Sequence, residues 1–179
     1  MRAPRVIALA GRRIDPSNTN NHAFPLSKVE SVRRQISSLL AEDLNSVLVC
    51  SAACGADLIA LREAARFAMP CRVILPFEPS TFRDMSVTDR PGNWGELFDA
   101  IVARADHSGD LVVLSENGNR DDAFTLANRT IIAQSLTIAA SSRHAVVVWE
   151  GTERSGSDFT AEFAEFANAV GFVRREILI

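Results

Sequence analysis

The stretch SVLVCSAACGADLIALREAA, residues 46–65, contains the three parts of one structural unit. It begins with an apolar run over residues 46–50 that shows no alternation, as in a strand buried on both faces. Small side chains follow over residues 51–56, and a helical segment then continues to Ala68, before Met69-Pro70 stops it. A buried strand, a turn of small residues and a helix together predict one unit of an α/β fold.

The same order recurs along the chain. Further apolar strands are predicted at Val6–Ala10, Arg72–Leu75, Leu111–Leu114, Ala145–Trp149 and Phe172–Leu178. Three helices are predicted at Ser27–Leu44, Gly55–Ala68 and Trp94–Ala105. A fourth helix is predicted after Asp121 or Asp122, either of which can cap it, and its apolar face carries Phe124, Ile131, Ile132 and Ile138. The last helix has Phe159, Phe163, Phe166 and Val170 on one face and Gly171 after its end. This alternation predicts a doubly wound α/β fold: a mostly parallel, Rossmann-like sheet with helices on both faces and with the loops after the first, second and fifth strands adjacent at one edge.

Two local patterns add to this prediction. Ser27 and Glu30 have the spacing of a capping box at the start of the first helix. Residues 77–93 contain Pro79, Pro91 and Gly92 without a clear period, and we interpret them as a long ordered loop at the edge of the sheet.

Length, charge and cysteine content restrict the class of protein. The chain has 179 residues and no repeat, which predicts a single domain over residues 1–179. Its apolar runs are too short to cross a bilayer and no signal-peptide core follows Met1, so we expect a cytoplasmic protein without a membrane partner. A net charge of −3 disfavours nucleic acid as a partner, and the 3 cysteines and 3 histidines show no metal-ligand spacing.

The loops after the first, second and fifth strands should form the ligand site, because α/β sheets bind ligands beyond the carboxyl ends of their strands. Backbone amides near Gly55 and Ala56 are candidate donors to a phosphate. Arg12 and Arg13 form either a fork for that phosphate or a solvated pair. Asp57 either complements the helix dipole or contacts a ribose or fixes the loop.

These motifs together resemble the SLOG superfamily, Rossmann-like domains named for the DNA-processing protein DprA and the LOG phosphoribohydrolases. The similarity rests on Ala10–Arg13, on Cys50–Asp57, on Leu75-Pro76-Phe77 and on Gly156–Glu162, and it spans nearly the whole chain. Residues 75–82, followed by Ser86-Val87 and Trp94, are similar to a subgroup found in bacterial multidomain signalling proteins. The resemblance implies a nucleotide or a nucleotide derivative as the ligand.

The LOG enzymes carry a glycine-rich loop that ends in a catalytic glutamate. In this chain Phe163 stands at the position of that glutamate and Ser157 and Phe159 replace two glycines. Glu162 lies one residue earlier, which rotates its side chain by about 100° on a helix. It is the weak candidate for catalysis, and we interpret it as a near-site or solvated residue.

The leading hypothesis is a domain that binds or senses a nucleotide-like ligand and needs no further cofactor. The alternative is a phosphoribohydrolase that cleaves nucleoside monophosphates with Glu162 or Asp57, and a DprA-like role in DNA or protein interaction or a domain that only oligomerises stay open. We expect a homo-oligomer, with signalling domains fused or adjacent. The predicted ligand-binding residues are Gly11, Arg12, Arg13, Ser51, Ala53, Gly55, Ala56, Asp57, Thr152, Gly156, Ser157 and Thr160.

Overall fold

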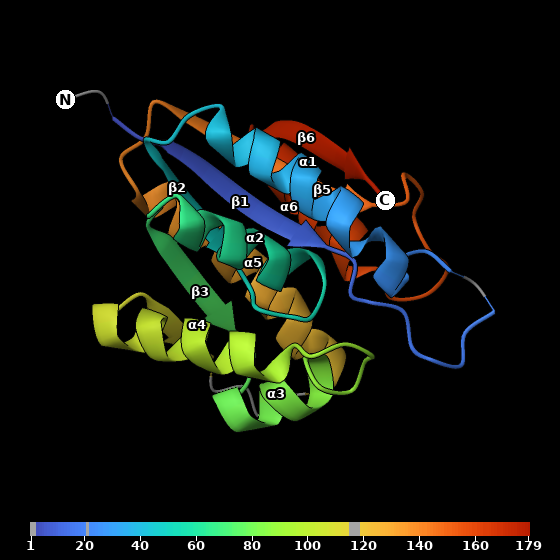
Figure 1. The fold of residues 1–179 in the computed structure, drawn as a ribbon. Coiled ribbons are helices and arrows are strands. Elements are labelled where there is room, and N and C mark those ends of the chain that lie inside the picture. The colour runs from blue at the N-terminus through green and yellow to red at the C-terminus, as the bar shows by residue number, and fades with distance from the viewer. Residues whose placement is uncertain (1–2, 21, 115–118) are drawn as a thin grey trace.

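The computed structural model describes residues 3–20, 22–114 and 119–179 and shows a parallel sheet between two layers of helices (Figure 1). The strands of the six-stranded sheet follow the order β4-β3-β2-β1-β5-β6, and every pair is parallel. Their bounds are β1 (Arg5–Gly11), β2 (Ser46–Cys50), β3 (Cys71–Leu75), β4 (Leu111–Val113), β5 (Ser142–Trp149) and β6 (Val173–Leu178). The predicted fold class is confirmed, and β2, β1 and β5 are neighbours as expected.

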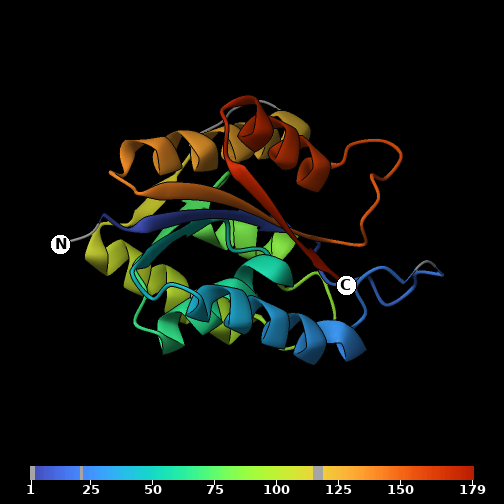
Figure 2. The same cartoon turned by 90° about the horizontal axis from the view of Figure 1, so that it is seen from above.

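The helices divide between the two faces of the sheet (Figure 2). They are α1 (Val29–Ala41), α2 (Ala56–Arg66), α3 (Pro79–Ser86) and α4 (Gly95–Ser108) on one face, and α5 (Arg120–Thr137) and α6 (Phe159–Ala169) on the other. Ile7 and Leu9 of β1 pack under α1 and α2, whereas Val6 and Ala8 belong to the core under α5 and α6. Alternate residues of β1 therefore serve two separate cores, which explains why the strand has no polar face.

Three local predictions were wrong. Residues 77–93 are not a continuous loop, because α3 begins at Pro79, where the missing N–H of proline costs no helical bond. The capping box at Ser27 and Glu30 does not form, since a short 3-10 helix (Leu26–Lys28) precedes α1 and Glu30 pairs with Arg33. The cap of α5 is Asn119, whose side chain accepts the Asp122 amide, rather than either aspartate.

Two cysteines lie at the ends of the short loop that joins β2 to α2. Cys50 and Cys54 are fully buried, and burial raises the pKa of both thiols. This agrees with a packing role, because a reactive cysteine needs an accessible thiolate.

Among the described residues, no helix combines the length and the apolar character that crossing a bilayer requires. The exposed large apolar side chains are Leu26, Leu44, Leu136, Val170, Val173 and Leu178. Self-association of the chain stays a prediction.

The end of α2 gives a first testable prediction. Ala68 follows this helix with φ of 52°, a left-handed conformation that an L side chain disfavours. We expect Ala68→Gly to raise the free energy of unfolding by about 1 kcal/mol in urea titrations, because glycine adopts this conformation without a Cβ penalty. The matched control is Ala65→Gly inside α2, which should lower it by about 1 kcal/mol. Equal effects of the two changes would contradict the assignment.

Candidate functional site

A cavity of about 470 Å³ lies at the carboxyl edge of the sheet. It is lined by the end of β1, the loop after β2, the start of α5 and the loop that leads into α6. The predicted site residues that line it are Gly11, Arg12, Arg13, Ser51, Ala53, Asp57, Ser157 and Thr160. Four predicted site residues do not line it: Gly55, Ala56, Thr152 and Gly156.

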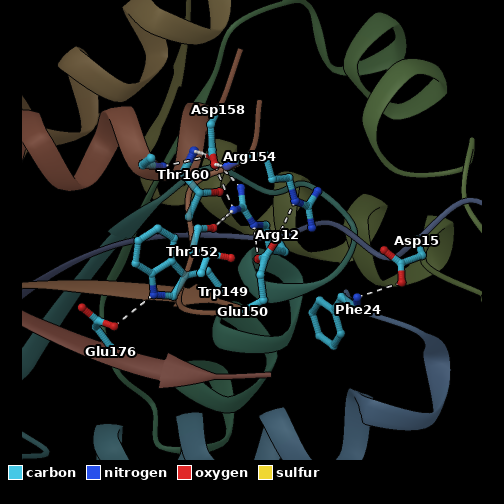
Figure 3. Close-up of polar contacts among 11 residues, drawn as sticks. Arg12, Asp15, Phe24, Trp149, Glu150, Thr152, Arg154, Asp158, Thr160 and Glu176 are labelled. Carbon is cyan, nitrogen blue, oxygen red and sulfur yellow. Dashed lines mark hydrogen bonds and ion pairs between the residues drawn. The ribbon is translucent and has the colours of Figure 1, made fainter. Parts of the chain in front are cut away.

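Arg12 lies directly after β1 and is only 5% exposed (Figure 3). Its Nε donates to Glu150 at 2.5 Å, and its two terminal nitrogens donate to the two carboxylate oxygens of Asp158 at 2.6 and 2.9 Å. One terminal nitrogen also donates to the carbonyl oxygen of Thr152 at 3.0 Å. The guanidinium is therefore not solvated, and a ligand phosphate would have to compete with two carboxylates for it.

Asp158 places an anion of the protein itself at the N-terminus of α6. Its carboxylate accepts the backbone amides of Arg154, Thr160 and Ala161 at 2.8 to 3.1 Å. Burial alone would raise the pKa of Asp158, but the hydrogen bonds from Arg12 and from the amides of Arg154 and Ala161 outweigh it and lower the pKa to about 2. Within the Gly156–Thr160 loop, the Thr160 amide is thus bonded to Asp158 and is not offered to a phosphate.

Two backbone amides around the N-terminus of α2 are also bonded within the protein. The Ala56 amide donates to the carbonyl oxygen of Arg12 at 3.1 Å, and the Ala53 amide donates to Asp57 at 3.2 Å. Gly55 has φ of 106°, and a Cβ at this position would lie 2.6 Å from the Arg12 carbonyl oxygen. Gly55 is therefore required by backbone conformation and close packing, and a larger residue there would move Arg12 as well.

Asp57 is a buried carboxylate that lines the cavity from the first turn of α2 and is 7% exposed. One oxygen accepts the Ala53 amide, and the other has no hydrogen-bond partner within the part of the chain that the structure describes. Burial raises the pKa of Asp57 to about 7, although the Ala53 amide and the charge of Arg13 oppose the shift. Such an unpaired buried oxygen calls for a physical explanation.

Four further arginines line the cavity. Arg13 and Arg90 both pair with Asp89, and Arg154 donates to Glu150 at 2.7 Å. Arg120 lies over the ring of Phe124, with 5.5 Å from the guanidinium carbon to the ring centroid. Across the opening, Ser157 donates to Asp121 at 2.9 Å and so joins the loop before α6 to the start of α5.

The other wall of the cavity is aromatic. Phe82 from α3, Phe124 from α5 and Phe159 from α6 line it, and the rings of Phe124 and Phe159 are 5.2 Å apart. The periodicity of the two long helices predicted Phe124 and Phe159 as apolar positions but assigned no ligand contact to them. The cavity residues that sequence reasoning missed also include Arg90, Arg120, Asn128, Arg154 and Asp158. Asp158 alone carried a signal, because an aspartate directly before an apolar helix is typical of an N-cap.

The Glu162 side chain of α6 does not line this cavity. It accepts hydrogen bonds from Thr125 at 2.9 Å and Asn128 at 3.1 Å, and it lines a second, acidic cavity of about 290 Å³. Phe163 is fully buried in the core, as its position on the apolar stripe predicts. Among the described residues, no group of three or more His, Cys, Asp or Glu side chains is placed to hold a metal ion.

Comparisons with known proteins identify the fold of the chain. No protein-family model matches the chain, and no curated protein matches it. Among solved structures, the chain is similar to DNA processing protein A (DprA) from Streptococcus pneumoniae, with 20% identity and a TM-score of 0.55. The match covers 97% of this chain and 50% of that chain, so the chain spans half the length of the solved structure. The protein thus has a Rossmann-like α/β fold that is similar to the fold of DprA.

Proposed function

We propose that the chain binds a nucleotide or a nucleotide-derived ligand in the cavity at the carboxyl edge of the sheet and acts as a ligand sensor. The observation that supports this most is the position of the cavity at the topological switch point between β1 and β5, which lead into helices on opposite faces of the sheet. Doubly wound sheets bind nucleotides at this point, because the loops of neighbouring strands diverge there to opposite faces.

The size and lining of the cavity suit this class of ligand. A volume of about 470 Å³ falls within the usual range for small-molecule sites, roughly 300 to 1,000 Å³. The aromatic wall offers rings for a base, and the arginines offer charge for a phosphate. Hydrolysis through Glu162 has less support, because Glu162 is bonded to Thr125 and Asn128 and does not line this cavity.

A role in DNA processing belongs to the protein named in the solved structure. The net charge of −3 in this chain is unfavourable for long-range attraction to DNA. A small ligand needs only a few local charges, which the cavity contains.

Titration calorimetry with the four common ribonucleoside 5′-monophosphates tests the proposal. We expect at least one of them to bind with a dissociation constant in the micromolar range, and we expect no free base after incubation when the mixture is analysed by chromatography. Ser51→Trp should abolish binding, because Ser51 lines the cavity and an indole there would fill it. Ser38→Trp on the exposed side of α1 is the matched control and should bind like the wild type.

Two results would contradict the proposal. If none of the monophosphates binds, or if Ser51→Trp binds as well as Ser38→Trp, the cavity is not a nucleotide site. Release of free base that Ser51→Trp abolishes would favour the phosphoribohydrolase instead.

A further inference from the structure

The inner part of the cavity is unfavourable for a phosphate. Two carboxylates, Asp57 and Asp158, lie there, and both are buried. Four amides around the N-termini of α2 and α6, those of Ala53, Ala56, Thr160 and Ala161, already donate to Arg12, Asp57 and Asp158. An anion placed there would meet the negative charge of these two carboxylates.

The unpaired oxygen of Asp57 requires the opposite chemistry. Above pH 7 Asp57 is ionised and its oxygens accept hydrogen bonds only, so the group that satisfies the unpaired oxygen must then be a donor. Leaving such an atom unpaired in a buried place costs free energy, and a donor brought by the ligand would remove this cost. A ribose hydroxyl and a base amino group both have this chemistry.

Positive charge gathers at the outer part of the cavity. Arg120 and Arg154 line it from the start of α5 and from the loop before α6, and both residues are exposed. None of the ion pairs among residues 3–20, 22–114 and 119–179 involves Arg120, and Arg154 shares Glu150 with Arg12. Exposed guanidinium groups can pair with a phosphate without loss of a buried contact.

We infer that the ligand enters with its nucleoside end inward and its phosphate outward: a hydroxyl or amino donor of the ligand bonds to Asp57, and the phosphate lies near Arg120 and Arg154. This inference rests on the proposed function and specifies the polarity of the ligand in the same cavity. It is the reverse of the arrangement in which a phosphate is held at helix N-termini. The nucleoside moiety then supplies most of the affinity, and the phosphate adds a contribution that salt can screen.

Calorimetry at 50 and 500 mM NaCl with adenosine, guanosine, cytidine, uridine and their 5′-monophosphates tests the polarity. We expect the nucleoside that matches the best monophosphate to bind, and the two affinities to agree within about threefold at 500 mM NaCl, where the Debye length is short. Asp57→Asn should weaken both ligands about 10- to 100-fold, the effect of one hydrogen bond to a charged group. Replacing both rim arginines, Arg120→Gln with Arg154→Gln, should weaken only the monophosphate.

The matched control for the first variant is Asp106→Asn at an exposed position of α4, which should bind both ligands like the wild type. The 2′,3′-dideoxynucleoside separates the two sources of the donor. If it binds more weakly than the nucleoside, the donor to Asp57 is a ribose hydroxyl. If it binds equally well, the donor to Asp57 is a group of the base. Asp57→Ala, with far-UV circular dichroism to verify folding, repeats the test with a side chain that cannot accept a hydrogen bond.

The outcomes separate the polarity from the function. If the monophosphates bind but no nucleoside does, or if Asp57→Asn and Asp57→Ala bind both ligands normally, the polarity is overturned and the nucleotide site stands. If neither nucleosides nor monophosphates bind, the proposed function fails and the polarity fails with it.

Discussion

Asp158→Ala is expected to lower the free energy of unfolding by about 4 kcal/mol at pH 7, because it leaves the buried guanidinium of Arg12 without its bidentate partner and removes the cap of α6. Denaturation in urea at constant slope measures the loss. Asp106→Ala on α4 is the control and should change stability by less than about 0.5 kcal/mol. A cost below about 1 kcal/mol for Asp158→Ala would show that Arg12 is not held by this pair.

The same contact predicts an acid dependence. The pKa of Asp158 is lowered from 3.8 to about 2 in the folded protein, so its stabilisation is complete above pH 4 and is lost as the pH falls from 4 toward 2. The shift corresponds to about 2 kcal/mol. Asp158→Ala should therefore lose less stability than the wild type over this range.

At neutral pH Asp57→Asn is expected to raise the free energy of unfolding, whereas Asp158→Ala lowers it. The pKa of Asp57 is raised from 3.8 to about 7, so the folded state binds the proton more tightly than the unfolded chain. The contribution of Asp57 to stability is then greatest below pH 4, falls as the pH rises to 7, and is constant above 7. About three pKa units correspond to a loss on the order of 4 kcal/mol for the wild type.

An asparagine at position 57 cannot ionise but can still accept the Ala53 amide, so the variant should not show this loss. We expect it to be about 2 kcal/mol more stable than the wild type at pH 8, because its unpaired amide group offsets part of the gain, and to have no advantage at pH 4. Urea titrations at pH 4, 5, 6, 7 and 8 measure the difference, with Asp106→Asn as the control that keeps the wild-type dependence. A difference between variant and wild type that does not change with pH would contradict the buried carboxylate.

The fold was predictable because its signals are local. Runs such as Val6–Ala10 and Ala145–Trp149 lack alternation, and only a parallel sheet covered on both faces buries such strands completely. The helix α3 was missed because a proline and several charged residues resemble a loop, although Pro79 is also suited to the first turn of a helix.

The site was predictable only in part, because its decisive contacts are distant in sequence. Ser51 and Asp57 follow a buried strand directly, and topology alone brings them to the carboxyl edge. The partner of Arg12 lies 146 residues further along the chain, and an arginine that binds a phosphate has the same local sequence as one that binds an aspartate. The aromatic wall was hidden for a related reason, since Phe124 and Phe159 share the helical period of core residues.

The central place of β1 has a consequence for how the chain folds. Its seven residues pair with Ser142–Val148 of β5. The hydrogen bonds on this side of β1 therefore cannot form until a segment more than 130 residues further along the chain is in place. Contacts of such long sequence separation require the closure of a large loop and form slowly. During synthesis the strand that precedes Arg12 therefore keeps one open edge until β5 has left the ribosome, and it is most vulnerable to aggregation in that interval.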